Sequence, residues 1–475
     1  MNPPPATVGS WRAILFYVLM IAAAVGLFLA VRGHGETLAA LPANEGSAAK
    51  VESAPSGSDA IRHVLLAMAA VILTGYALGR VFACVGQPPV IGEVMAGILL
   101  GPSLLGRETS AIILPPSIAP YLGVIAQLGV ILYMFLVGLE LNLSRLRGRA
   151  QATVTIAHTG IVVPFLLGAG LALWLYPRYS QSGVPFTSFA LFIGIALSIT
   201  AFPVLARILS DRRMARSELG VLSLGCAAMG DVTAWCLLAF VVGVTQAKVG
   251  GAVAVAGLAL GFIALMFLIV RPMAACFVRR TGDGPLSTGA ITLVFTGVLL
   301  SALATEAIGI HAVFGAFLLG AMIPHDSAIA REFTHKLENV VSVLLLPAFF
   351  AYVGMRTEIG LLAGWTNWLV CGVIILAATA GKWGGTLAAG RLTGLDWRTS
   401  ASLGVLMNTR GLMELIVLNI GLDLGVISPT VFAMMVIMAL ATTLATTPLL
   451  ILLERKDGSA SRGVEEARAS ELMAQ

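Results

Sequence analysis

Apolar residues dominate this chain in runs of about twenty, and short polar stretches separate each run from the next. A bilayer core about 30 Å thick takes about 20 helical residues to cross. The pattern therefore predicts an all-α, polytopic membrane protein with fourteen spans. The predicted spans are 14–31, 61–84, 90–105, 121–141, 152–176, 187–209, 217–245, 251–277, 287–305, 309–324, 338–356, 366–388, 399–419 and 429–453.

Basic residues are distributed unevenly between the predicted loops, and this gives the orientation. The richer side, which we assign to the cytoplasm together with both termini, has Arg145, Arg147, Arg149, Arg212, Arg213, Arg216, Arg279, Arg280, Arg331, Lys336, Arg391, Arg398, Arg455 and Lys456. The opposite loops have little more than Lys50, Arg107, Arg178 and Lys248. Because a missed span would scramble this alternation, it supports the number of spans independently of hydropathy.

Composition excludes several other classes of protein. Of the 475 residues, 58% are hydrophobic and 11% are charged, whereas soluble domains have about one quarter charged residues. The net charge of +5 follows from the loop bias, and no basic run with interleaved aromatic residues indicates a nucleic-acid partner. The five cysteines show no CxxC spacing, so we expect neither a disulfide nor structural zinc. We also find no enzyme or cofactor motif in a suitable context, so we expect a non-enzyme without a cofactor.

Three regions follow from the same pattern. Residues 1–60 comprise a hydrophobic span and a flexible external linker, 61–453 form the membrane domain, and 454–475 form a short cytoplasmic tail. The first span is either a signal peptide or an uncleaved anchor. Its length, about 18 apolar residues, is long for a signal peptide and favours the anchor. We expect a multi-pass protein of the cell membrane.

Two predicted spans contain helix-breaking residues near their middle. In "LSITAFPVLARIL" (197–209), Pro203 lacks an N–H, and the hydroxyls of Ser198 and Thr200 compete for backbone bonds, so we expect an unwound turn. In "LGVLMNTRGLMELIVLNIG" (403–421), the polar residues Asn408, Thr409, Arg410, Gly411 and Glu414 interrupt an apolar helix. Polarity at that depth must face protein or a water-filled cavity.

The two broken spans are the sixth and the thirteenth, so they cross the membrane in opposite directions. Spans two to seven and nine to fourteen then form inverted repeats of six helices, although we find little residue identity between the halves. Paired interrupted helices in two halves of a membrane protein indicate a transporter site near the bilayer midplane.

Asp231 is the lone charge in "LSLGCAAMGDVTAWCLLAFVVGV" (222–244), about 21 Å along its helix at 1.5 Å per residue. An acid there costs about 2.5–3.5 kcal/mol on insertion scales, so it should face the bundle interior and have a function. A structural ion pair is the alternative. Its small neighbours, Gly230 and Thr233, permit the approach of ions or water.

The broken spans can supply the further oxygen ligands that a cation needs in addition to one carboxylate. Half-helix ends present unpaired carbonyls, whose partial negative charge can help bind a dehydrated Na⁺ or K⁺. Thr200 and Ser198 can add oxygen ligands, which makes Asp231 and Thr200 the candidate ligands of the metal cation. The alternative for Thr200 is a hydroxyl bonded to its own helix.

Two further sets of charges lie within apolar spans. Lys382 in "AATAGKWGGTLAAG" either balances charge in the core or extends its ammonium group to the cytoplasmic face. Arg410 and Glu414 are four residues apart, which favours an internal ion pair with a gating or structural role over direct ion binding. The weaker signals Glu93, Glu140, Glu306, His158 and His311 lie near span ends, where solvation or capping is the commoner explanation. Glu93 and Glu140 can alternatively line a cytoplasmic cation funnel.

With these residues in place, the chain resembles the second family of monovalent cation:proton antiporters, which has the Na⁺/H⁺ exchanger fold. Within that family it resembles in particular the plant cation/H⁺ exchanger-like and glutathione-gated potassium efflux-like branch. The matching motifs are "GQPPVIGEVMAGILLGPSLLG" at 86, "FLVGLELNL" at 135, "SITAFPVLARIL" at 198, "MGDVTAW" at 229, "GKWGGT" at 381 and "MNTRGLMELIVLNIG" at 407.

The resemblance implies a homodimer in which each subunit has a dimerisation domain and a core domain with two crossed, discontinuous helices that moves like an elevator. It places Asp231 at the ion-binding aspartate, Thr200 at the crossing, Arg410 and Glu414 in the second broken helix, and Lys382 at the core lysine.

Two departures from the family pattern bear on mechanism. Family members have Asn, Asp or Gln before the aspartate, whereas this chain has Gly230. The two-carboxylate versions are associated with electrogenic exchange, so a single Asp231 favours one H⁺ for one cation. The sequence also shows neither the nucleotide-binding domain of the potassium efflux relatives nor the long hydrophilic tail of the plant exchangers.

The sequence therefore predicts a secondary antiporter that exchanges K⁺ or Na⁺ for H⁺, with the proton and the cation competing for Asp231. Two alternatives remain open at this stage. One is a gated cation channel on the same scaffold. The other is a membrane sensor or structural subunit without transport, which Gly230 keeps open.

Overall fold

The computed structural model describes residues 10–40, 57–140, 150–215, 217–246, 251–281 and 286–454, and all regular elements within them are helical. Several sequence-based expectations lie outside the described residues. These are most of the 41–60 linker, the tail beyond 454, and the loop residues Lys50, Arg145, Arg147, Arg149, Arg216, Lys248, Arg455 and Lys456.

The helices of the N-terminal half follow the predicted spans. They are α1 (Ser10–Gly35), α2 (Gly57–Cys84), α3 (Pro89–Leu100), α4 (Pro102–Ile113), η1 (Pro116–Ile118), α5 (Ala119–Glu140), α6 (Ala150–Tyr179), α7 (Phe186–Ser198), α8 (Phe202–Asp211) and α9 (Glu218–Gln246).

The C-terminal half has a similar order of helices, which follows the linking segment α10–α11 (residues 251–281). Its elements are α10 (Gly251–Leu265), η3 (Met266–Val270), α11 (Arg271–Thr281), α12 (Thr288–Ile308), α13 (Ala312–Met322), α14 (Ala328–Val340), η4 (Val341–Leu345), α15 (Leu346–Arg356), η5 (Ile359–Leu362), α16 (Trp365–Leu392), α17 (Trp397–Met407), α18 (Leu412–Asp423) and α19 (Pro429–Glu454).

Every predicted span has a helical counterpart. Among the described residues, eleven helices are long and apolar enough to cross a membrane, and the pairs α3–α4 and α17–α18 meet at bends of 62° and 46°. The short apolar helix α13 corresponds to the remaining span. Two expectations were wrong in detail. The 309–324 segment forms an 11-residue helix rather than a full span, and the 90–105 segment bends where Gly101 and Pro102 end α3.

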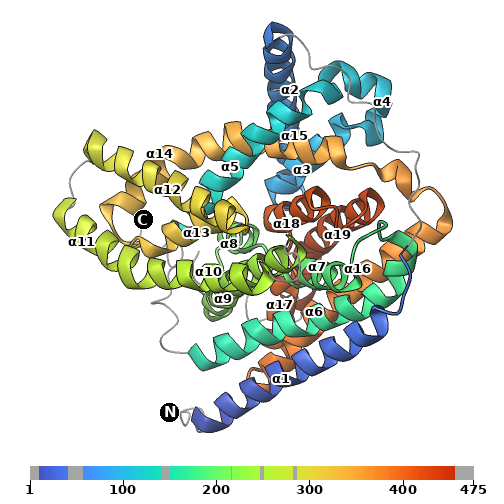
Figure 1. Cartoon of the computed structure of the whole chain (residues 1–475), viewed down its shortest axis with the longest axis vertical. Coiled ribbons are helices and arrows are strands. Elements are labelled where there is room, and N and C mark those ends of the chain that lie inside the picture. Colours follow the sequence, from blue (N-terminus) through green and yellow to red (C-terminus); the bar gives the residue numbers. More distant parts are fainter. Residues whose placement is uncertain are drawn as a thin grey trace, which may run out of the picture.

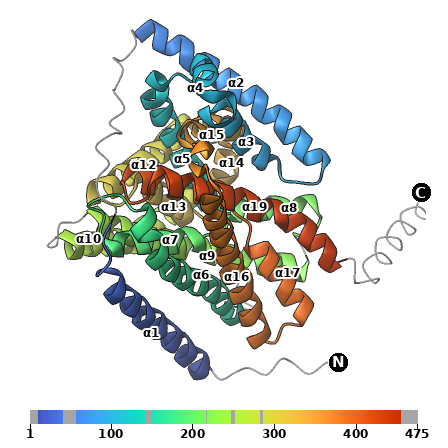
Figure 2. The same cartoon turned by 90° about the vertical axis from the view of Figure 1, so that its right-hand side faces the viewer.

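The helices pack as two groups. The scaffold group comprises residues 57–140 and 251–362, and in it α2, α3 and α5 pack with α12, α13 and α15. The core group comprises residues 150–246 and 365–454, and in it α6, α7 and α9 pack with α16, α17 and α19. Packing between the groups is sparser than within either of them. In Figures 1 and 2, α2 and α4 lie at one side of the molecule and α1, which packs on α6 and α7, lies at the other.

The two halves repeat one packing arrangement. In the scaffold, α3 packs on α15 just as α13 packs on α5, and in the core α6 contacts α7 and α9 just as α16 contacts α17 and α19. Glycines make the scaffold contacts close: Gly97 meets Gly354, and Gly320 meets Gly138, backbone against backbone. Because equivalent spans are seven apart, the two halves run in opposite directions, and the inverted repeat is present in the fold.

We expect Gly354→Ala to destabilise the protein by about 1–3 kcal/mol, the usual effect of overpacking. The added methyl group would overlap the Gly97 carbonyl oxygen, which belongs to rigid backbone. Unfolding midpoints in detergent measure the effect. Gly261→Ala on α10 is the matched control, because nothing lies within 4 Å of its added carbon. Equal midpoints for the two variants would contradict a tight glycine contact.

Candidate ion-binding site

The first broken helix unwinds where the sequence predicts it. Helix α7 ends at Ser198, Ile199 and Ala201 have extended backbone, and α8 begins at Phe202. Pro203 lies in the first turn of α8, where its missing N–H has no helical partner to lose. The break therefore separates two half-helices inside the core group.

The second broken helix is interrupted at the predicted polar residues. Helix α17 ends at Met407, and α18 begins at Leu412 beyond a four-residue segment that includes Asn408 and Gly411. Glu414 lies in the first turn of α18, where the positive end of the helix dipole favours an acid.

The two unwound segments bond to each other where they cross. The backbone N–H of Ala201 donates to the Thr409 carbonyl (3.0 Å), and the Thr200 hydroxyl donates to the Met407 carbonyl (2.9 Å). On the other side, Thr443 of α19 accepts from the Arg410 N–H (2.9 Å) and donates to the Arg410 carbonyl (2.7 Å). These bonds satisfy backbone groups that lipid cannot.

Buried cations cap the C-terminal end of α7. The Arg410 guanidinium donates through Nη1 to the Ala196 carbonyl (2.7 Å) and through Nη2 to the Leu197 carbonyl (2.6 Å), while Lys382 Nζ donates to the Ser198 carbonyl. We expected these carbonyls to be unpaired and available to a transported cation. That expectation was wrong for α7, because its last three carbonyls are already bonded to protein cations.

Arg410 also pairs with Glu414. Its Nη1 lies 2.9 Å from Glu414 Oε2, and both side chains are fully buried. This is the predicted internal ion pair, but Arg410 lies in the break rather than on the helix and spans both broken segments. Lys382 is 1% exposed, so it does not extend to the cytoplasmic face.

Asp231 lies in α9 and is 3% exposed. Its Oδ2 is buried and accepts no hydrogen bond from the described residues. Lys382 is close enough to interact with Asp231 electrostatically. The preceding residue, Gly230, has open space at its own position, because a Cβ built on it meets nothing within 4 Å.

The remaining predicted residues gather around the same crossing, mainly as hydrogen-bond donors. The Ser198 hydroxyl donates to the carbonyls of Gly194 (2.7 Å) and Ile161 (3.0 Å), and Thr409 donates to Leu406 (2.9 Å). Asn408 Nδ2 donates to Thr379 at 3.5 Å, while its buried Oδ1 accepts no hydrogen bond within the part of the chain that the structure describes. The hydroxyls of Ser198 and Thr200 can therefore contact a cation only through their oxygen lone pairs.

Sequence reasoning missed Thr443, which holds the second break in place. The run "ATTLATTP" (441–448) was a usable signal, because four hydroxyls in the last span exceed what an apolar helix needs. The weaker signals Glu306 and His311 cap the start of α13 as predicted, accepting from the N–H groups of Ala312 (2.9 Å) and Val313 (3.5 Å).

Comparisons with known proteins agree with this geometry. Residues 68–453 match the family described as "Sodium/hydrogen exchanger, transmembrane". The chain is 44% identical over 389 residues to the Na⁺/H⁺ antiporter NhaS4 of Synechocystis sp., an alignment that covers 80% of this chain and 95% of that relative. It is 39% identical to Cation/H⁺ antiporter 19 of Arabidopsis thaliana, an alignment that covers 77% of this chain and 46% of that relative. It is 33% identical to K⁺/H⁺ antiporter 1 of Saccharomyces cerevisiae, covering 78% and 44%. The chain thus spans less than half the length of these plant and yeast relatives.

A solved structure shares the fold. The sodium proton antiporter MjNhaP1 of Methanocaldococcus jannaschii, at pH 8, superposes with a TM-score of 0.59 at 16% identity. The match covers 82% of this chain and 96% of that one.

We expect Arg410→Gln to lower the free energy of unfolding by about 3–5 kcal/mol, the usual effect of removing one partner of a buried ion pair. The change leaves Glu414 unpaired and removes the cation from two α7 carbonyls. Unfolding midpoints in detergent report it. The control is Arg207→Gln on α8, whose pair with Asp211 is exposed and should contribute about 1 kcal/mol or less. Similar shifts for the two variants would contradict the capping role of Arg410.

Proposed function

Because this chain belongs to the sodium/hydrogen exchanger family, we propose that it exchanges a monovalent cation for H⁺ across a membrane, with Asp231 binding the two in competition. Asp231 carries the proposal. A buried carboxylate oxygen without a donor is costly while charged, and either a proton or a cation removes that cost. We assign Thr200 and Ser198 as further ligands of the cation, through the lone pairs of their hydroxyl oxygens.

The transported cation is K⁺ or Na⁺. The names of the relatives support both, since the Synechocystis protein is named for Na⁺ and the yeast protein for K⁺. Both ions take oxygen ligands of the kind that a carboxylate and a hydroxyl supply.

Exchange is one for one and proceeds by movement of the core group against the scaffold group. The loaded carboxylate is neutral with either occupant, so both loaded forms cross with the same charge. Each pH unit across the membrane then supplies about 1.4 kcal/mol, enough for a tenfold cation gradient. The sparse packing between the two groups supports movement at that interface.

The protein acts as a transporter rather than an enzyme, in the cell membrane, with both termini in the cytoplasm. The basic residues at the ends of α8, α11 and α16 support this orientation. We also propose a homodimer formed through the scaffold group, as the family resemblance implies.

We expect Asp231→Asn to abolish cation-driven proton flux, because the amide neither ionises nor binds a cation in place of H⁺. A pH-sensitive dye in everted vesicles measures the flux after pulses of Na⁺, K⁺, Li⁺ or Rb⁺. Asp326→Asn, which alters an exposed acid, is the control. Retained exchange in the Asp231→Asn protein would refute the assignment, and cation flux without proton movement would favour a channel.

We expect the exchange rate to be unchanged when the membrane potential is clamped at different values, because one H⁺ replaces one cation. Gly230→Asp provides the contrast, because a Cβ added at Gly230 meets nothing within 4 Å and a second carboxylate adds charge to one loaded form. Its exchange should become sensitive to potential. Wild-type exchange that follows the potential would contradict the one-for-one ratio.

A further inference from the structure

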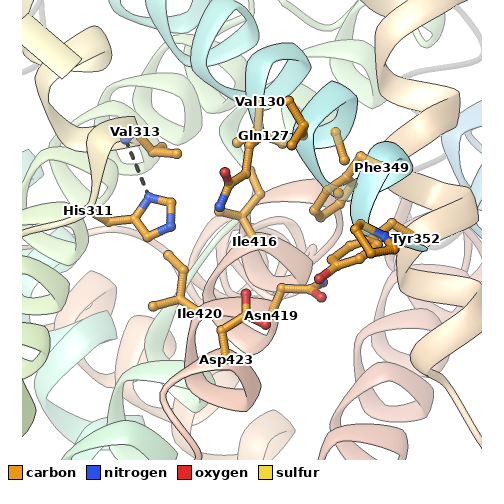
Figure 3. Close-up of a pocket in the computed structure, with 14 residues that line it drawn as sticks. Gln127, Val130, His311, Val313, Phe349, Tyr352, Ile416, Asn419, Ile420 and Asp423 are labelled. Atoms are coloured by element: carbon orange, nitrogen blue, oxygen red, sulfur yellow. Dashed lines mark hydrogen bonds between the residues drawn. The ribbon is translucent and has the colours of Figure 1, made fainter. Parts of the chain in front are cut away.

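A second polar site lies where the core group meets the scaffold group, away from the helix crossing. A cavity of about 240 Å³ opens between α18 on the core side and α5, α13 and α15 on the scaffold side. Figure 3 shows Gln127, His311, Tyr352, Asn419 and Asp423 arranged around it. Helix α18 connects the two places, since it starts beside the crossing and ends at Asp423, about 18 Å further along at 1.5 Å per residue.

The cavity offers oxygen ligands suited to a partly hydrated cation. Asp423 supplies a carboxylate, Asn419 an amide oxygen, and Gln127 and Tyr352 further oxygens. The volume has room for an ion with several waters, each of which takes about 30 Å³ in the liquid. Asp423 is the last residue of α18, and a helix C-terminus attracts positive charge.

One cation of the protein is already bound to these ligands. Arg356, at the end of α15, places Nη2 2.6 Å from Asp423 Oδ1 and donates from Nη1 to Asn419 Oδ1 (3.1 Å). The same Nη1 donates to the Tyr352 hydroxyl (3.2 Å), and the guanidinium lies 4.9 Å from the centre of the Tyr352 ring. The ligands are thus arranged to hold a positive charge, and that charge belongs to the scaffold group.

We propose that Asp423 and Asn419 form an outer cation-binding site in series with Asp231, and that the Arg356 guanidinium is its built-in competitor. The inference rests on the proposed antiport function and extends it to the path of the ion. A cation that binds Asp423 displaces Arg356 and so removes a bond between the two groups. In the predicted orientation this site faces the outside of the cell.

The test is the dependence of proton flux on cation concentration in right-side-out and in everted vesicles. Arg356→Gln removes the competitor, so the KM for Na⁺ or K⁺ on the cavity side should fall about three- to fivefold, the range expected for a partly exposed ion pair. Asp423→Asn should raise that KM by a similar factor. In both variants the KM measured from the opposite side should change less than twofold.

The double variant Arg356→Gln/Asp423→Asn separates competition from a general disturbance. If Arg356 acts through Asp423, the double variant should have the KM of Asp423→Asn alone. Arg107→Gln is the matched control, because Arg107 pairs with Glu358 near the same end of α15 but within the scaffold group. It should leave the KM unchanged on both sides.

The outcomes distinguish the two proposals. Suppose that wild-type flux requires Asp231. The outer site is then overturned, and the antiport function stands, if the Asp423 and Arg356 variants leave the KM unchanged, if they shift it equally on both sides, or if both variants shift it in the same direction. If the wild type shows no flux, the antiport function is overturned. The outer site is then tested by thermal unfolding of the Asp231→Asn protein in NaCl or KCl, compared with choline chloride. If adding Asp423→Asn removes the stabilisation by Na⁺ or K⁺, the site is supported. If the stabilisation persists, the site is overturned.

Discussion

The structure depends on one requirement: in a membrane interior, every backbone carbonyl released by a broken helix must find a partner within the protein. Breaking α7 releases the carbonyls of Ala196, Leu197 and Ser198. Arg410 and Lys382 supply the donors; Lys382 comes from α16 and Arg410 from the break between α17 and α18, both far along the chain. The break and the two buried cations are therefore parts of one arrangement, because neither is tolerable alone at this depth.

The two buried acids balance the charge of the two buried cations. Glu414 neutralises Arg410 directly, through a bond between two fully buried groups. Asp231 balances Lys382 only through space, because no described donor bonds to its Oδ2. Among the charged side chains that are buried in the described part of the chain, Asp231 is thus the one whose neutralisation breaks no hydrogen bond or ion pair to a described residue. This asymmetry supports assigning the exchangeable site to Asp231 and a structural task to the Arg410–Glu414 pair.

The sequence was informative wherever a property is local. Most span lengths, the breaks at Pro203 and at Asn408–Gly411, and capping by Glu306 and His311 follow from neighbouring residues, and the structure contains them. The long-range partners could not be predicted, since nothing near Arg410 indicates that its guanidinium reaches α7. The glycine contacts Gly97–Gly354 and Gly138–Gly320 were missed for a related reason. The two halves have these contacts at equivalent places in the fold, although the sequences around the glycines are dissimilar.

The same groups that make the break possible also bear on how an ion can pass it. The unwound segments are bonded to each other through Thr200 and Ala201, and Thr443 closes the second segment from the other side. A cation moving along a fixed pore at this level would have to pass the charges of Arg410 and Lys382, which repel it at low dielectric. Binding at Asp231 followed by movement of the whole core group avoids that passage, because the ion and the two cations then move together. The buried positive charges therefore favour alternating access over a continuous channel.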